Sequence, residues 1–155
     1  MVAVLFVCLG NICRSPAGEG ILKRLTKEDA SFAEMRIESC GLGGWHVGQL
    51  PDSRMRKAAL DRDIVLASRA QQFRYEFFDE FDIILAADKD VLNELYQEAK
   101  SAHHKSKVRL VTAYSGSYPN QEIPDPYYGS TKDFDLALDM LHDACEGLLE
   151  ELKKS

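Results

Sequence analysis

The feature that most limits the possible folds is a short apolar run followed at once by a loop and a helix start. Residues 2–7 read Val-Ala-Val-Leu-Phe-Val, the pattern of a strand buried on both faces of a parallel sheet. Pro16 then stands where the first turn of a helix tolerates proline, and an apolar stripe continues that helix to about Lys27. A central strand that leads directly into a helix predicts an α/β fold.

The rest of the chain repeats this alternation. The predicted later strands are residues 35–40, 81–86 and 108–112, and the predicted later helices are 52–61, 71–78, 88–100 and about 130–153. Residues 115–129 have no periodicity and are rich in proline and tyrosine, which is typical of a functional or disordered loop. We therefore expect a single-domain doubly wound four-stranded parallel sheet over residues 1–155, with helices on both faces and the ligand at the carboxyl ends of the strands.

Composition narrows the function classes. The 155 residues include 45% hydrophobic residues, enough for a core without disulfides. The four cysteines, at positions 8, 13, 40 and 145, form no CxxC pair, which favours a reducing, cytoplasmic compartment. The longest apolar run is too short to span a membrane. A net charge of −6 gives no general attraction for nucleic acid, so a bound anion would have to be held by a local group of positive or N–H-donating residues.

A cysteine stands between the predicted first strand and first helix, in the segment Cys8-Leu-Gly-Asn-Ile-Cys-Arg14-Ser15. The free N–H groups and the positive dipole end of a helix stabilise negative charge. Cysteines in such places ionise far more readily than ordinary thiols, which are mostly protonated at neutral pH. We expect Cys8 to be a thiolate and a catalytic nucleophile, with Ser15 donating its hydroxyl to the sulfur.

The same segment is long enough to curl around one tetrahedral anion. Its backbone N–H groups can point at the anion's oxygens, with Gly10 easing the curl and Asn11 accepting a left-handed backbone. Arg14 can add two parallel hydrogen bonds. The predicted phosphate-binding residues are Leu9, Gly10, Asn11, Ile12, Cys13 and Ser15. A buried cysteine before an ordinary Ser-Pro helix cap is the plainer interpretation, but the Cys-x5-Arg-Ser spacing favours the anion site.

At this point the sequence resembles a known family. Val7-Cys-Leu-Gly-Asn-Ile-Cys-Arg-Ser-Pro16 is similar to the signature of the low-molecular-weight protein tyrosine phosphatases. The likeness continues in Ser39-Cys-Gly with Trp45-His-Val-Gly48, in Phe81-Asp82 with Asp88, and in Asp125-Pro-Tyr-Tyr-Gly129. The resemblance implies a four-stranded parallel sheet and hydrolysis of phosphotyrosine in proteins through a phosphocysteine, without metal or cofactor and with inorganic phosphate as product.

Such chemistry also needs an acid that protonates the leaving oxygen and later activates water. Asp125 is the candidate, because Pro124 and Pro126 bias it toward an extended conformation that projects its carboxyl group. In isolation Pro-Asp-Pro is equally well a rigid turn. Beside the Cys8 segment and the family's matching Asp-Pro-Tyr-Tyr, the acid role is favoured, with a kcat/KM maximum on the acidic side of neutral.

Aromatic residues predict the substrate pocket. Tyr127 and Tyr128, together with Trp45, could wall a slot that suits a phenyl phosphate but is too deep for phosphoserine. Core packing is the alternative for one of the tyrosines. The arginine phosphatases of the family carry threonine where this chain has Ile12, so phosphotyrosine is the expected substrate.

Other candidates carry less weight. The resemblance allows a protective disulfide between Cys13 and Cys8, although a small buried side chain explains Cys13 equally well. Cys145 fits the core, and Cys40 has no expected role. The four histidines lack companions for a metal site, and His103 and His104 fit a solvated turn. Asp88 resembles a family aspartate that steadies the site, and also fits a helix N-cap. Where the family often has His-Gly-Ile and then Ala-Arg-Gln, this chain has Arg62-Asp-Ile64 and Ala70-Gln-Gln72, so a histidine is missing near Arg62.

Three other functions remain as alternatives. An arsenate reductase of the same fold would need two further cysteines after the third strand, and none lies between Cys40 and Cys145. A sugar phosphotransferase subunit would not require both Arg14 and Asp125. A non-catalytic phosphotyrosine-binding module is disfavoured because Cys8, Arg14 and Asp125 are all present. We expect a monomer that binds neither nucleic acid nor membrane.

Overall fold

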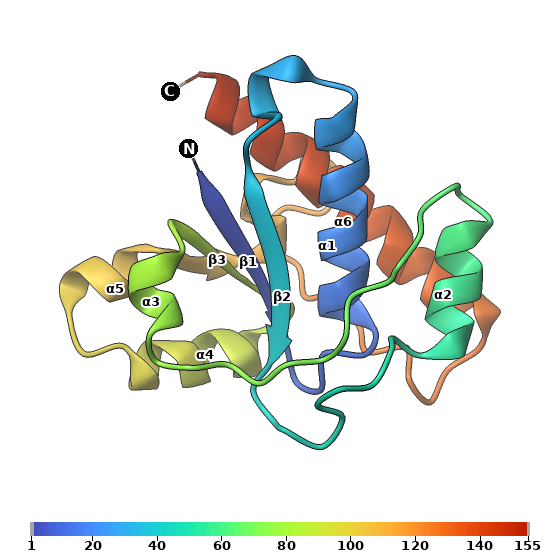
Figure 1. Ribbon diagram of the computed structural model, residues 1–155, viewed down its shortest axis with the longest axis horizontal. Helices are drawn as coiled ribbons and strands as arrows, with labels where there is room; N and C mark the ends of the chain where they lie inside the picture. The colour runs from blue at the N-terminus through green and yellow to red at the C-terminus, as the bar shows by residue number, and fades with distance from the viewer. Residues whose placement is uncertain (1, 155) are drawn as a thin grey trace.

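A parallel sheet of four strands forms the centre of the computed structural model, which describes residues 2–154 (Figure 1). The strands are β1 (Ala3–Cys8), β2 (Arg36–Gly41), β3 (Ile83–Ala86) and β4 (Val108–Leu110), in the spatial order β2-β1-β3-β4. All six residues of β1 are buried, as expected for a strand with neighbours on both sides and helices on both faces. The four-stranded doubly wound prediction is confirmed.

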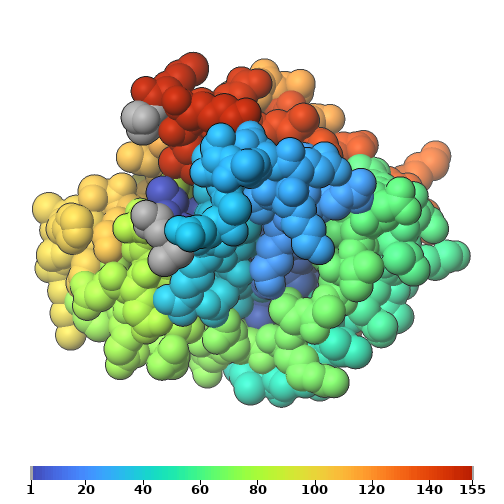
Figure 2. Space-filling model, turned by 45° about the horizontal axis from the view of Figure 1, so that its top comes forward, coloured from blue at the N-terminus to red at the C-terminus, as the bar shows by residue number. Residues whose placement is uncertain are grey.

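Helices cover both faces of this sheet. The helices are α1 (Arg14–Lys27), α2 (Ser53–Leu60), α3 (Phe77–Glu80), α4 (Lys89–Glu98), α5 (Ala102–Ser106) and α6 (Thr131–Lys153), with 3-10 turns η1 (Ala30–Phe32) and η2 (Val111–Tyr114). In Figure 1, α1, α2 and α6 lie to one side of the strands and α3, α4 and α5 to the other. Figure 2 shows α6 (red) against α1 (blue), with β1 (dark blue) almost wholly covered.

Alternation along β1 divides the core into two clusters. Val4 and Phe6 pack in a cluster with α1, α2 and α6, whereas Leu5 and Val7 pack in a second cluster with α3 and α4. Successive strand residues point to opposite faces, so one strand supports both layers. Its carboxyl end, where Val7 pairs with both neighbouring strands, is fixed from two sides.

The helix predicted at residues 71–78 is wrong over most of its length. Gln72 makes an isolated parallel bridge with Gly41, and α3 begins only at Phe77. Gly41 donates its N–H to the Gln71 carbonyl at 2.9 Å, and Phe73 donates to the Gly41 carbonyl at 2.7 Å. These long-range hydrogen bonds hold the segment extended along the edge of the sheet, overriding its local helical pattern.

Smaller differences concern other elements. Residues 102–106, expected as a solvated turn, form α5, and the His104 ring stacks on Phe78 at 5.1 Å and contacts Asp79 Oδ1 at 2.8 Å. β4 ends at Leu110, and the backbone then turns into η2. None of the helices within residues 2–154 is both long enough and apolar enough to span a membrane.

Candidate active site

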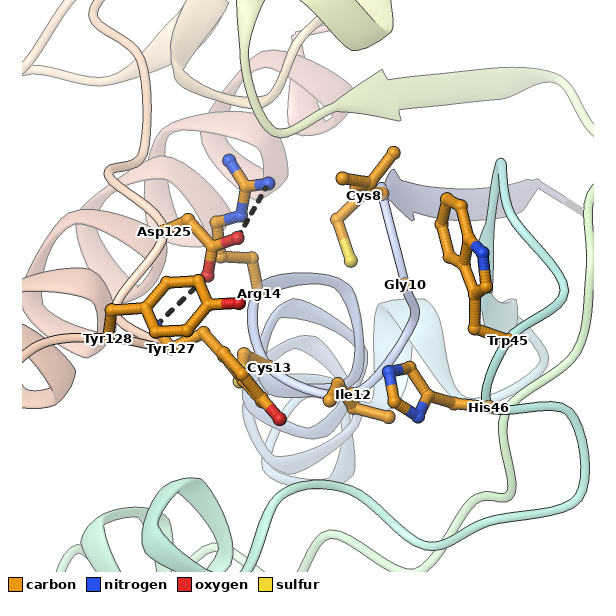
Figure 3. Close-up of a pocket in the computed structure, with 11 residues that line it drawn as sticks. Cys8, Gly10, Ile12, Cys13, Arg14, Trp45, His46, Asp125, Tyr127 and Tyr128 are labelled. Atoms are coloured by element: carbon orange, nitrogen blue, oxygen red, sulfur yellow. Dashed lines mark hydrogen bonds and ion pairs between the residues drawn. The ribbon is translucent and has the colours of Figure 1, made fainter.

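The loop between β1 and α1 forms the floor of a pocket of about 250 Å³. The residues that line it are Cys8, Leu9, Gly10, Ile12, Cys13, Arg14, Trp45, His46, Asp125, Tyr127 and Tyr128. In Figure 3 the Cys8 sulfur points into the space between two walls. Arg14, Asp125 and the two tyrosines form one wall, and Trp45 and His46 form the other. The pocket thus lies at the carboxyl end of β1, as predicted.

Two polar groups contact the sulfur of Cys8. Ser15 Oγ lies 2.9 Å from the sulfur, and the Asn11 N–H donates to it at 3.3 Å. Ser15 Oγ also accepts a hydrogen bond from Asn11 Nδ2 at 2.7 Å, so its single proton can be given either to the sulfur or to the Cys40 carbonyl, which lies 3.2 Å away. A thiolate at Cys8 would accept that proton, because it has none of its own to give. The expected Ser15–Cys8 contact is therefore present.

Asn11 fixes the shape of the loop. Its φ of 58° is in the left-handed region, as expected. Besides Ser15, its amide nitrogen donates to Ser39 Oγ at 3.0 Å, and its amide oxygen accepts the Gln71 N–H at 2.9 Å. Ser39 in turn donates to the buried Glu19 carboxylate at 2.5 Å. Both N–H groups of the Asn11 amide and its oxygen are thus engaged in holding the loop.

Gly41, at the end of β2, lies directly against this loop. A Cβ atom added there would come within 2.9 Å of backbone atoms of Leu9, Gly10 and Asn11. The Leu42 N–H donates to the Cys8 carbonyl at 3.0 Å. Only glycine permits so close an approach between two backbones, so β2 determines the position of the loop.

Arg14 lies in the first turn of α1 and is only 4% exposed. Its Nη1 donates to Asp88 Oδ2 at 2.7 Å and to the Ile123 carbonyl at 3.0 Å. Its Nη2 lies 3.8 Å from Asp125 Oδ2. Burial lowers the pKa of Arg14, but the Cys8 sulfur and the Asp88 carboxylate raise it, and the net direction is upward. The guanidinium therefore stays charged and oriented beside Cys8.

Asp125 and the aromatic residues form the upper part of the pocket. The Asp125 carboxyl group is half exposed and accepts the Tyr127 N–H at 3.1 Å. The Tyr127 and Tyr128 rings meet edge to face at 4.9 Å. Trp45 is 67% exposed and Tyr128 is 96% exposed. These two residues belong to an open rim, which explains why neither packs in the core.

Every residue predicted for the site is near this pocket. The side chains of Asn11 and Ser15 hydrogen-bond to each other and do not line the pocket, whereas the other ten residues line it. Sequence reasoning gave no role to His46, although it follows Trp45 directly and its ring packs over Gly10. It also missed Glu19, which follows Ser15 by four residues and so shares its helix face. Asp88 turns out to be both a helix cap and a partner of Arg14.

The remaining cysteines are buried, free thiols. Burial raises the pKa of Cys13, and the nearby Asp52 and Asp125 carboxylates raise it further. Burial also raises the pKa of Cys40 and Cys145. All three are therefore protonated at neutral pH. Within residues 2–154, no group of three or more His, Cys, Asp or Glu side chains could hold a metal ion.

Comparison with known proteins gives one consistent result. The family model described as low molecular weight phosphotyrosine protein phosphatase matches residues 3–155. A putative low molecular weight protein-tyrosine-phosphatase of Synechocystis sp. is 40% identical over 151 residues, covering 97% of this chain and 96% of the relative. The human low molecular weight phosphotyrosine protein phosphatase is 34% identical, with 96% and 94% covered.

Solved structures agree. A protein tyrosine phosphatase from Entamoeba histolytica matches with a TM-score of 0.95 and 36% identity, covering 99% of this chain and 98% of that one. Wzb of Vibrio vulnificus in complex with benzylphosphonate matches with a TM-score of 0.83 and 25% identity, covering 97% and 98%. The chain therefore belongs to the low molecular weight phosphotyrosine protein phosphatase family.

Proposed function

We propose that this chain hydrolyses phosphotyrosine in proteins through a phosphocysteine formed on Cys8, without a metal ion. The observation that carries the proposal is the meeting of the Cys8 sulfur, the Arg14 guanidinium and the Asp125 carboxyl group at one pocket, before the N-terminus of α1. Phosphoryl transfer to a thiolate requires a nucleophile, a group that binds the phosphoryl oxygens and an acid, and these three residues supply them in that order. No further cysteine between Cys40 and Cys145 supports an arsenate-reducing relay.

In the first step the Cys8 thiolate attacks phosphorus in line with the ester oxygen. The sulfur–phosphorus bond forms, the phosphorus–oxygen bond breaks, and protonated Asp125 gives its proton to the departing phenolate. In the second step ionised Asp125 takes a proton from water; the water oxygen bonds to phosphorus, the sulfur–phosphorus bond breaks, and inorganic phosphate and the Cys8 thiolate are released. The Ser15 hydroxyl, 2.9 Å from the sulfur, then stabilises the thiolate that leaves.

Arg14 and the loop bind the phosphoryl oxygens. Arg14 is already oriented by Asp88 and Ile123, so little reorganisation accompanies charge development in the transition state. The backbone N–H groups of residues 9–15 sit at the positive end of the α1 dipole. In a chain of net charge −6, this local arrangement supplies the attraction for a dianion.

The rim supports an aryl substrate. Trp45 and His46 on one side and Tyr127 and Tyr128 on the other leave a slot between aromatic walls (Figure 3), which favours a planar phenyl group. The Vibrio structure contains benzylphosphonate, an arylmethyl phosphonate similar in shape to a phenyl phosphate. The proposed partners are therefore phosphotyrosine-containing proteins.

We further propose that the chain acts as a single domain over residues 1–155, as a monomer and in the cytoplasm. Its four free thiols fit a reducing compartment.

The decisive experiment is hydrolysis of p-nitrophenyl phosphate in EDTA. We expect activity in the parent chain, inhibition by vanadate, and loss of turnover in Cys8→Ser. The matched control is Cys145→Ala, which removes a thiol buried in the core far along the chain and should keep the activity. Dependence on a divalent cation, together with survival of the Cys8→Ser variant, would overturn the proposal.

A second experiment tests the acid. Asp125→Asn should lower kcat/KM by roughly 10²-fold for phenyl phosphate, whose leaving group needs a proton, and less for p-nitrophenyl phosphate. The reaction uses the acid form of Asp125 together with the thiolate form of Cys8, so the kcat/KM of the parent should vary with pH. An unchanged Asp125→Asn variant with a flat acid-to-neutral profile would remove Asp125 from the mechanism.

A further inference from the structure

Arg54, in the first turn of α2, contacts the loop that carries the proposed acid. We call residues 124–129 the acid loop. Arg54 Nη2 donates to the Tyr127 carbonyl at 2.8 Å. The guanidinium carbon also lies 5.4 Å from the centre of the Tyr127 ring and 4.8 Å from that of Phe134 in α6. One side chain thus holds a loop carbonyl and packs against two aromatic rings.

Asp52 holds this guanidinium in place and links it to residues 8–15, which we call the phosphate loop. Its carboxylate accepts two hydrogen bonds from the Arg54 side chain, at 3.1 Å from Nε and 2.9 Å from Nη2. Burial raises the pKa of Asp52, but the hydrogen bonds from Arg54 lower it, and the net direction is downward. The Asp52 N–H also donates to the Ile12 carbonyl at 2.8 Å. The pair therefore connects the Cys8 loop to the acid loop.

The acid loop has few other anchors. Within residues 2–154, the Arg54 guanidinium is the only side chain outside the loop that donates a hydrogen bond to residues 124–129. Arg14 approaches Asp125 only to 3.8 Å. The residue that Arg54 holds, Tyr127, is also the one whose N–H orients the Asp125 carboxyl group at 3.1 Å. A contact at Tyr127 can therefore fix the acid without touching substrate.

We propose that Arg54 is a positioning residue that holds Asp125 over the Cys8 sulfur by tying the acid loop to Asp52, which is itself hydrogen-bonded to Ile12 of the phosphate loop. The proposal rests on the assignment of Asp125 as the acid in the proposed function. Arg54 has no direct part in the reaction, since it does not line the pocket. Its substitution therefore affects proton donation to the leaving group and leaves anion binding intact.

Leaving-group dependence separates this role from a general contribution to stability. We expect Arg54→Ala to lower kcat/KM about tenfold for phenyl phosphate and about twofold or less for p-nitrophenyl phosphate, because the second leaving group depends less on the acid. The inhibition constant of vanadate should not change. In an Asp125→Asn background the same substitution should lower kcat/KM for phenyl phosphate by less than about twofold, since it acts through Asp125.

Arg56→Ala is the matched control, because Arg56 lies on the same helix and donates to the Pro51 carbonyl at 3.0 Å, away from the acid loop. It should leave the ratio of the two substrates unchanged. If Arg54→Ala does not fold, Arg54→Lys keeps the charge and loses the two-pronged fork, and should show the same substrate-dependent loss.

Equal losses for both substrates, no loss for either, or full additivity with Asp125→Asn would overturn the positioning role. If Asp125→Asn alone shows no leaving-group dependence, the acid assignment itself fails. If Asp125→Asn shows that dependence and Arg54→Ala does not, only the inference about Arg54 fails.

Discussion

Asp88 Oδ2 lies 2.7 Å from Arg14 Nη1, while Asp88 Oδ1 accepts the Val91 N–H at 2.8 Å. One carboxylate thus orients the buried guanidinium and begins α4. The arrangement connects the carboxyl end of β3 with the first turn of α1, the helix that follows β1, and β1 is the neighbour of β3 in the sheet. The orientation of Arg14 therefore depends on the start of α4 as well as on α1.

Two substitutions separate the tasks of Asp88. Asp88→Asn keeps an N-cap oxygen but removes the negative charge, so we expect roughly tenfold lower kcat/KM with little change in the helix cap. Asp88→Ala should lose the same activity and a further ~1 kcal/mol of stability from the cap. Steady-state kinetics and urea unfolding measure both effects. An Asn variant with wild-type kinetics would show that the negative charge of Asp88 is not needed to orient Arg14.

The fold was predictable because its signals are local. The apolar run of β1, Pro16 at the start of α1 and the apolar stripe of α6 each report burial directly. Residues 71–73 were misassigned because their conformation follows from hydrogen bonds to Gly41, which is distant in the sequence. A local pattern contains no information about such a partner.

The site residues also differ in whether the local sequence could predict them. Cys8, Arg14 and their loop lie within one contiguous motif, so spacing alone predicted them. Asp125 needed the family resemblance, because its loop has no periodicity. Arg54 stood in a helix that was predicted, yet its role depends on the distant Tyr127 carbonyl, and no sequence pattern indicates that contact.

Asn11 allows its backbone and side-chain contributions to be measured separately. Asn11→Gly keeps access to the φ of 58° but loses the amide hydrogen bonds to Ser15 and Ser39. Asn11→Ala loses both, so it should be less stable than the glycine variant by about 1 kcal/mol. Both should lower kcat, because Ser15 is no longer oriented toward Cys8. Equal stabilities of the two variants in urea unfolding would contradict strain at this position.

Gly41→Ala tests the close approach of β2 to the phosphate loop. Its Cβ would lie 2.9 Å from three backbone atoms of that loop, so the loop must move, at a cost of about 1–3 kcal/mol and with weaker vanadate binding. Gly116→Ala is the matched control, because nothing lies within 4 Å of the added atom. Vanadate inhibition and thermal unfolding measure the two effects. Wild-type vanadate affinity in Gly41→Ala would show that the loop tolerates displacement.

The ionisation of Asp143 should account for part of the loss of folding stability at low pH. Hydrogen bonds from Ser115 and from the Ser117 N–H, the latter at 3.0 Å, lower the pKa of this α6 carboxylate. A pKa that is lower in the folded state gives stability that is present above the unfolded value and lost as pH falls through the folded one. Asp143→Asn should therefore destabilise the protein most at neutral pH, with the difference from wild type shrinking below about pH 4.

Urea unfolding between neutral and acidic pH measures this difference. Glu150→Gln, an exposed position on the same helix, is the control and should not reproduce the pH dependence. A stability difference for Asp143→Asn that stays constant with pH would show that the ionisation of Asp143 does not contribute.

Trp45 should contribute to binding of the aryl group and not of the phosphate. Its ring lies so close to Gly43 that a Cβ there would overlap it, so the side chain is held at the rim although it is 67% exposed. Loss of one aromatic contact is worth about 0.5–1.5 kcal/mol. Trp45→Ala should therefore raise KM for a phosphotyrosine peptide several-fold while the inhibition constant of inorganic phosphate stays the same. Val47→Ala, also exposed but outside the pocket, should change neither value, and an equal rise in both constants for Trp45→Ala would instead place its effect in the phosphate loop.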